Sequence, residues 1–555
     1  LICCCSAAQD TVEAVAFSLS MGVAASCPEA ICESTDAVPQ IIVVEQVASH
    51  GLEPGDLEQV QEVPVETTVS ATYVEARTIS KIKRSLLLEK KLHTDTEIMR
   101  GVSVKSTLRN FGRIWRKSPL DMSEQERAKL WDAAVPVEQF DVFLSHTWHT
   151  RGIWKWLSLS LQLTWPHILL CGFVACLLLE LLFFIDLLPA LGDQWQVSFQ
   201  GYEGTAPFSL WAIIAEGSFS LLPFLLAPWM PCTKPYFAFL DVASINQADE
   251  ELKERGIYGI GGFLKASKEL RILWSRPYLS RLWCIFEIAA FLRGNPEGRI
   301  VLQPLFVEVT VLVCWLGMHV VVVLWLLTMV FLSSLGNYTL FVALAPFLAV
   351  FHSLRKNFLL KRQLFKEIQN FDLAAVECRS SFDKEFVHAA IAEWYGGEDA
   401  FTEYVRGPLQ KELMTTQPAG IQISYCMILV APFLSVGIST FVGLLKAGVP
   451  LHILISYFFA AVVGLWFCWV AAMVQFAMFL CDRLARPLIP RVDFLQTLFI
   501  FTIFVLTAFS GLQFGIRAYR DSLATSIIWS AVSVFLLWLT NGGLAKLSSL
   551  RMRGL

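Results

Sequence analysis

One carboxylate stands out in the stretch SRPYLSRLWCIFEIAAFL, residues 275–292. Glu287 lies in an apolar, helix-like run directly after the pair Trp283–Cys284. Apolar surroundings perturb the pKa of a carboxyl group, and perturbed groups gather at functional sites. A simpler interpretation is an acid at the rim of a helix that pairs with Arg281 or Arg293 on neighbouring turns. Both readings follow from the sequence, and catalysis or ligand binding is the hypothesis worth testing.

Other reactive side chains give weaker signals. His146 and His149 have the i, i+3 spacing of a metal pair, but no cysteine or carboxylate follows at a matching distance, so we expect no metal site. Cys284 with His146 as base would make a nucleophile, yet a buried cysteine is more often inert. The 14 cysteines contain no CxxC pair, which argues against a disulfide framework.

Four short β-rich runs should position these residues, namely 140–145, 236–241, 270–275 and 299–306. Each of the first three precedes a helical pattern, as in βαβ units with a parallel sheet. Ligands bind at the strand ends of such sheets, which is where Glu287 would lie. The first and second runs are separated by far more residues than a crossover helix needs. The excess matches one membrane hairpin inserted into an α/β domain.

The composition is that of a membrane protein. Of 555 residues, 55% are hydrophobic, and the mean hydropathy is +0.54. Apolar runs long enough to cross a bilayer recur about eight times and pair as four hairpins. They lie near 164–189, 206–230, 304–332, 338–354, 421–445, 451–480, 494–516 and 522–544. The net charge of −4 and the lack of a strongly basic block argue against a nucleic-acid partner, so the expected partner is the lipid bilayer.

Charge between the spans predicts their orientation. The connections 190–205 and 333–338 contain no Lys or Arg, whereas the segments 354–366, 481–491 and 546–553 are basic. Basic segments stay in the cytosol, so both termini and the α/β domain should be cytosolic. The sequence does not indicate which membrane holds the protein.

Ser123 and Glu126 form a capping-box pattern that should begin a helix before the first strand.

The chain divides into eight predicted parts. The parts are a disordered acidic arm with an unknown protein partner (1–75), basic amphipathic helices (76–135), the α/β domain (136–163 with 231–306), an inserted hairpin (164–230), a second hairpin (304–354), a helical segment (355–419), four membrane helices (420–545) and a cytosolic tail (546–555).

The strand and loop motifs resemble the Toll/interleukin receptor (TIR) domain. FDVFLSHTW is similar to its first strand and loop, and FAFLDVASIN to its second strand. The plant immune type has six motif residues at fixed relative positions, matched here by Ser275, Tyr278, Ser280, Trp283, Cys284 and Glu287. The stretch from Ile245 to Gln247, with Arg281 and Trp283, also resembles the fungal heterokaryon-incompatibility domain. Both resemblances imply a flavodoxin-like parallel sheet.

The TIR resemblance implies a reaction as well. In TIR enzymes that cleave NAD⁺, the glutamate of this motif stabilises the ribosyl cation while nicotinamide leaves, a role that Glu287 would take. Ser145, His146, Trp148 and Trp283 would contact the nucleotide, with Trp148 stacking on a ring. NAD⁺ would be a substrate, with no permanently bound cofactor. TIR-type self-association is a further expectation. The loop HTWHTRG departs from the family's usual aromatic and arginine positions, so the mode of nucleotide contact is open.

Two other functions compete with this enzyme hypothesis. One is a non-catalytic TIR-like assembly module held at a membrane. The other is an ion channel or transporter with a regulatory cytosolic domain, because Glu180, Asp186 and Glu216 fall in the first hairpin and intramembrane carboxylates often mark ion paths. In 371–401, the apolar residues of an amphipathic pattern should face the α/β domain or the membrane surface, with core packing favoured; they include Leu373, Val376, Phe386, Ile391 and Trp394.

Overall fold

The computed structural model describes Leu92 and residues 95–190, 194–231, 236–276, 278–331, 344–376, 378, 381–416 and 421–543. The predicted disordered arm 1–75, the tail 546–555 and residues 338–343 of the predicted span 338–354 lie outside the described residues.

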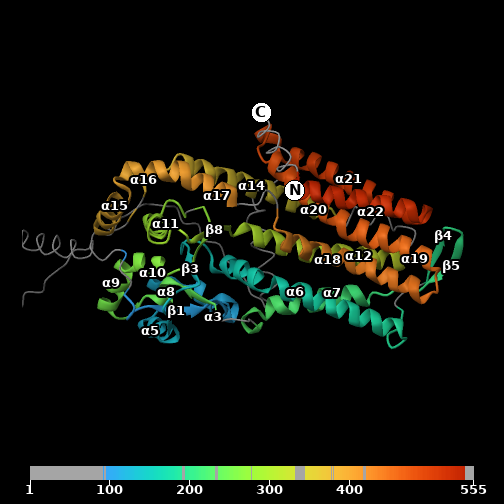
Figure 1. Ribbon diagram of the computed structural model, residues 1–555, viewed down its shortest axis with the longest axis horizontal. Coiled ribbons are helices and arrows are strands. Elements are labelled where there is room, and N and C mark those ends of the chain that lie inside the picture. The colour runs from blue at the N-terminus through green and yellow to red at the C-terminus, as the bar shows by residue number, and fades with distance from the viewer. Residues whose placement is uncertain are drawn as a thin grey trace, which may run out of the picture. The chain divides into compact units, whose positions relative to one another are not determined.

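A six-stranded sheet forms the centre of the α/β part (Figure 1). Its strands are β1 (Arg100–Ser103), β2 (Val135–Pro136), β3 (Val142–Ser145), β6 (Phe237–Phe239), β7 (Glu269–Trp274) and β8 (Arg299–Pro304). They lie in the order β2-β1-β6-β3-β7-β8. All four predicted strands are present. The sheet also begins earlier than the predicted boundary at 136, since β1 comes from a segment that we expected to be helical.

The strands β6, β3, β7 and β8 are parallel, and β1 adds an antiparallel edge against β6. In chain order the four parallel strands have the arrangement 2-1-3-4, which is that of flavodoxin-like sheets. The order reverses between β3 and β7, so the crevice beyond their carboxyl ends is the expected ligand position. Phe143 of β3 is opposite both Phe239 and Leu270, and all three are buried.

Short helices surround the sheet: α3 (Val104–Thr107), α4 (Arg109–Gly112), α5 (Glu124–Ala133), α8 (Asp241–Ser244), α9 (Glu250–Tyr258), α10 (Ile260–Lys265) and α11 (Leu282–Gly294). The predicted capping box at the start of α5 is confirmed, because the Ser123 hydroxyl accepts from the Glu126 amide at 3.2 Å. A later group consists of α15 (Ser381–Tyr395), α16 (Glu398–Tyr404) and α17 (Gln410–Thr416); α15 packs on α11, and α17 packs on β8 (Figure 1). The predicted packing of 371–401 is confirmed, since Leu373, Phe386 and Ile391 share one buried cluster with strands β7 and β8.

The connection from β3 to β6 enters the membrane bundle and returns. It consists of α6 (Gly152–Phe184), the hairpin strands β4 (Trp195–Phe199) and β5 (Tyr202–Ala206), and α7 (Trp211–Leu225), which packs along α6. The first part of α6 is buried against the sheet, whereas Leu170, Phe173 and Leu178 near its other end are at least half exposed. A helix of 33 residues is about 50 Å long, so α6 is long enough to serve both as a crossover helix and as a span. The strands β4 and β5 mark the end of the bundle opposite the sheet, called the distal end below (Figure 1).

The remaining bundle is built from α12 (Phe306–Phe331), α14 (Phe347–Gln369), α18 (Ile423–Lys446), α19 (Leu451–Tyr457), a π-helical stretch (Phe458–Trp469), α20 (Val470–Arg483), α21 (Asp493–Asp521) and α22 (Leu523–Trp538). Only Leu305 separates β8 from α12. Two helices, α6 and α12, therefore continue almost directly from strands of the sheet into the bundle.

Six helical segments are long and apolar enough to cross a membrane. They are Gly152–Phe184, Phe306–Leu327, Ile423–Lys446, Leu451–Arg483, Pro490–Asp521 and Leu523–Gly542. The described residues thus give six candidate spans and not eight. The predicted span 206–230 contains the 15-residue helix α7, which is shorter than a full crossing requires. Residues 347–354 of the predicted span 338–354 form the start of α14, whose second half is rich in Lys and Arg.

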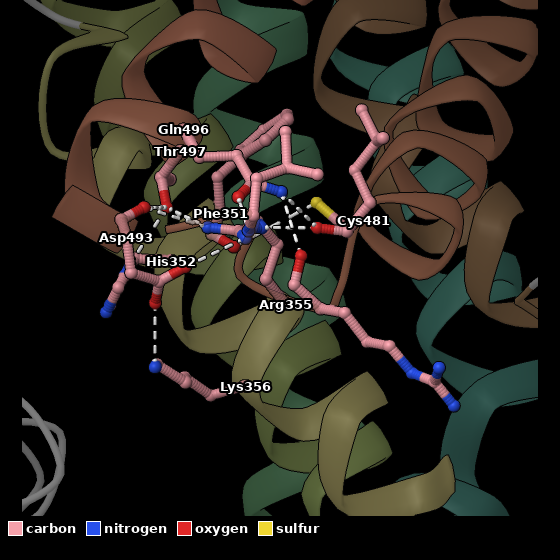
Figure 2. Close-up of polar contacts among 11 residues, drawn as sticks. Phe351, His352, Arg355, Lys356, Cys481, Asp493, Gln496 and Thr497 are labelled. Atoms are coloured by element: carbon pink, nitrogen blue, oxygen red, sulfur yellow. Dashed lines mark hydrogen bonds and ion pairs between the residues drawn. The ribbon is translucent and has the colours of Figure 1, made fainter. Parts of the chain in front are cut away.

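A buried arginine joins α14 to the end of α20 and the start of α21 (Figure 2). Arg355 donates to the carbonyl oxygen of Leu484 at 2.9 Å, to the Thr497 hydroxyl at 2.6 Å and to the Asp493 carboxylate at 2.9 Å. Lys356 lies 2.7 Å from the other oxygen of Asp493. Because the Arg355 side chain is only 1% exposed, these contacts must satisfy its charge.

Candidate functional site

Polar side chains from three strands meet at the carboxyl edge of the sheet. Ser145 is the last residue of β3, Asp241 follows β6, and Tyr278 follows β7. Glu287 reaches the same edge from α11. The chain reversal between β3 and β7 creates this convergence, because parallel strands bring their carboxyl ends together. The structure therefore assembles Ser145 and Glu287, which we predicted to share a site.

The Ser145 hydroxyl forms short hydrogen bonds to the Glu287 carboxylate and to the Tyr278 hydroxyl. Ser145 and Tyr278 are each 1% exposed, and Glu287 is half-buried. A hydroxyl that donates to a carboxylate can still accept from a phenol. The three groups thus form a chain in which Tyr278 donates to Ser145 and Ser145 donates to Glu287.

The environment favours the protonated form of Glu287. Burial raises the pKa of Glu287 to about 8; the hydrogen bond from Ser145 acts in the opposite direction, and the negative charge of Asp241 adds to the rise. At neutral pH the carboxyl group is mainly neutral when nothing is bound. A positive charge next to it would stabilise the carboxylate, so the site is suited to a cationic group.

A second polar group, next to the first, contains His146, Lys155 and Asp241. The Lys155 ammonium lies 3.2 Å from Nδ1 of His146, and Nε2 of the same ring lies 3.4 Å from Asp241. Burial lowers the pKa of His146, and Lys155 lowers it further, although Asp241 opposes the change. The neutral imidazole accepts from Lys155 at Nδ1, and its Nε2 proton faces Asp241.

Trp148 is fixed on both sides. Its indole N–H donates to Asp241 at 2.7 Å, and the Lys155 ammonium lies 4.9 Å from the centre of its ring. Trp115 lies on the ammonium as well, at 5.6 Å, so Lys155 is held between two indole rings. The Asp241 side chain remains 37% exposed. Its pKa is lowered, because contacts with His146, Trp148 and the Val242 amide outweigh the opposing effect of burial.

Trp283 has different neighbours from the other predicted site residues. Its ring packs against Phe286 and Phe386, and its N–H lies 3.4 Å from Asp383 of α15. These contacts join α11 to α15. The predicted role of Trp283 in nucleotide contact stays a prediction.

The Cys284 thiol donates to the backbone carbonyl of His146 at 3.8 Å. Burial raises the pKa of Cys284 well above its ordinary value, and the neighbouring Glu287 raises it further. A thiol in this state is a poor nucleophile. Its hydrogen bond fixes the loop after β3 to α11, which is a structural role.

Sequence reasoning missed Lys155 and Asp241. Asp241 ends the apolar run of β6, and an acid directly after a buried strand is a recognisable signal for a strand-end site. Lys155 is the only cation in α6, which is otherwise an apolar helix, and this isolation was the available signal. That Lys155 and Asp241 both contact His146 could not be predicted without the fold.

Comparisons with protein-family models, with curated proteins and with solved structures found no match.

Proposed function

We propose that this protein is a membrane-embedded signalling protein whose α/β domain binds NAD⁺ and hydrolyses the bond between nicotinamide and ribose. The observation that carries the proposal is the half-buried Glu287 carboxyl, bound by Ser145 at the carboxyl edge of the sheet. The nicotinamide ring of NAD⁺ is cationic, and the ribosyl group becomes cationic as the bond breaks. A carboxylate next to that carbon would stabilise both charges.

The reaction requires no cofactor beyond water. The bond between C1′ and the nicotinamide nitrogen breaks, and nicotinamide leaves with the electron pair. The oxygen of a water molecule then bonds to C1′ and releases a proton to solvent. Glu287 must be ionised for this role, so binding of the cationic substrate is expected to release the proton that the raised pKa retains.

Trp148 supports the proposal from the other side of the site. Its indole ring is held by Asp241 and Lys155, so a nucleotide ring that stacks on it would not have to order the side chain first. Asp241 offers a partly exposed carboxylate that can accept from a ribose hydroxyl.

The decisive experiment measures nicotinamide release by the purified full chain in detergent micelles or lipid nanodiscs. The wild type should release nicotinamide from NAD⁺, and Glu287→Gln should lower the rate by at least about a hundredfold. Glu297→Gln changes an exposed acid between α11 and β8, and this matched control should leave the rate unchanged. Retained activity in Glu287→Gln would refute the site assignment.

Two further outcomes correspond to the competing functions. If no nicotinamide is released, even when the protein is clustered, the domain is better explained as a non-catalytic assembly module, whether or not it binds NAD⁺. Ion flux through reconstituted vesicles that falls in Glu180→Gln would instead favour a channel or transporter.

A further inference from the structure

A polar contact inside the bundle joins Glu216 of α7 to His319 of α12. Oε2 of Glu216 lies 2.5 Å from Nε2 of His319, and Glu216 is 4% exposed. Gly217 makes this approach possible, since a Cβ atom at that position would lie 3.0 Å from Cδ2 of His319. Ionisable groups are costly at membrane depth, so a pair buried between two helices has to be specifically accommodated.

The hydrogen bonds of His319 determine how many protons the pair holds. Nδ1 lies 2.9 Å from the carbonyl oxygen of Trp315, which can only accept, so Nδ1 carries a hydrogen. The contact to Glu216 then needs one more proton, located on either Nε2 or the carboxyl oxygen. In both cases the pair has no net charge. One exchangeable proton therefore keeps the pair neutral, and its gain or loss creates a charge inside the bundle.

Glu180 of α6 extends this polar region toward the distal end. One oxygen of its carboxyl group accepts from the Ser209 hydroxyl at 3.0 Å and from the Ala212 amide at 3.2 Å, which caps the start of α7. The other oxygen is buried without a hydrogen-bond partner among the described residues. Glu216 lies one helical turn after Ala212 in α7, or roughly 6 Å along the axis, so the two acids belong to one region. An unpartnered buried carboxyl oxygen indicates a group that takes up a proton.

The other ionisable groups favour access from the distal end. The helices packed against α7 are α6, α12 and α18. Their titratable or charged residues, in the described part of the chain, are Lys155, His167, Cys171, Cys176, Glu180, Glu308, Cys314, His319, Tyr425, Cys426 and Lys446.

On the distal side, Asp186 is 84% exposed and lies 2.6 Å from Lys446. Asp186 follows Glu180 by about two helical turns, or roughly 9 Å. On the sheet side, the next carboxylate of α12 is Glu308, about 16 Å from His319 along the helix.

We propose that Glu216 and His319 form a proton-binding site inside the bundle, loaded from the distal end through Asp186 and Glu180. Acidification there adds a second proton, so that the neutral pair becomes a cation between α7 and α12. The two helices must then separate slightly to hydrate the charge. The site is independent of the chemistry proposed for Glu287. However, α6 is connected to β3 by the loop after that strand, and α12 begins one residue after β8. A shift between the two helices would therefore reach the sheet.

Infrared difference spectroscopy of the full chain in lipid nanodiscs tests the proton site. Spectra between neutral and acidic pH should contain a carboxylic-acid carbonyl band that Glu216→Gln removes. Glu203→Gln, an exposed acid in the β4–β5 hairpin, is the matched control and should keep that band. In His319→Gln the Glu216 carboxyl group loses its basic partner. The pH at the midpoint of the band should therefore rise by about one unit.

Folding and access need separate measurements. The melting temperature and a monodisperse elution profile establish that each variant is folded, and Glu216→Asp, which retains a carboxyl group, should keep a titrating band. If Glu216→Gln is folded and its difference spectrum equals that of the wild type, the proposal is overturned. In sealed vesicles with the α/β domain outside, the band should follow the internal pH. A band that follows the external pH would overturn the assigned direction of access.

Discussion

The ammonium of Lys155 lies 3.2 Å from Nδ1 of His146, and this contact joins a membrane-entering helix to the loop after β3. Lys155 is fully buried in the first turn of α6, whereas His146 directly follows the strand. The same ammonium lies over the ring of Trp148. A displacement of α6 along its axis would therefore move His146 and Trp148, the side chains that contact Asp241.

Lys155→Met should disorder this corner of the site. Methionine keeps the apolar stem, but the charge that holds Trp148 and lowers the pKa of His146 is lost. We expect the pKa of His146 to rise and the affinity for NAD⁺ to fall at least about tenfold, a change of about 1.4 kcal/mol. Binding measured by calorimetry over a range of pH checks both effects.

Lys129→Met, in the exposed face of α5, provides the control for the removed charge. It should bind NAD⁺ like the wild type. Equal affinities in Lys155→Met and the wild type would show that Lys155 does not position the site.

Ser145→Ala should raise the pKa of Glu287 above about 8, because the hydrogen bond from Ser145 lowers that pKa in the wild type. The pH at which nicotinamide release reaches half of its maximum should move upward by a measurable fraction of a unit. Ser275→Ala is a matched control, since the Ser275 hydroxyl bonds to Thr150 instead. An unchanged pH profile in Ser145→Ala would contradict the described hydrogen bond.

The stability of the protein should fall with rising pH because of Glu287. Its ordinary pKa of 4.5 is raised to about 8 in the folded protein, so between these values the folded state holds a proton that the unfolded state has lost. The stabilisation is complete below about pH 4.5 and is lost as the pH rises toward 8. Glu287→Gln should remove this dependence and stabilise the protein at pH 8 relative to the wild type.

We expect a difference on the order of 2 kcal/mol between wild type and Glu287→Gln at pH 8, after allowing for partial solvent screening. Melting temperatures in detergent micelles at pH 5 and pH 8 measure it. Parallel changes in both proteins would mean that another group causes the pH dependence.

The buried arginine in Figure 2 should matter far more than its neighbour. Arg355→Met removes the buried hydrogen bonds to Leu484, Asp493 and Thr497, while Lys356 still pairs with Asp493, so we expect a cost of about 1–3 kcal/mol. Lys356→Met removes an ammonium that is 49% exposed, and its expected cost is below about 1 kcal/mol. Thermal unfolding of the two variants in micelles compares them directly, and equal losses would refute the ranking.

Local patterns in the sequence were sufficient to locate most elements. The strands around Phe143, Ala238, Ile272 and Leu302 were predicted because each apolar run is short and β-rich, and the spans because hydropathy is summed over about 20 neighbours. The same reasoning predicted eight spans, whereas the described residues contain six candidate spans, because summed hydropathy does not detect that α7 ends after 15 residues. It also missed β1, a four-residue strand that is stable only beside β6.

The sequence by itself determined the class of this protein: an apolar helical bundle, an α/β sheet interrupted by an inserted hairpin, and an acid, Glu287, in the first helix after β7. These features depend on residues close together in the chain. Only the tertiary structure decided what the acids touch. Ser145 and Glu287 are 142 residues apart, and Glu216 and His319 are 103 residues apart. Because a hydrogen bond depends on distance in space, such partners become known only when the sheet and the bundle are assembled.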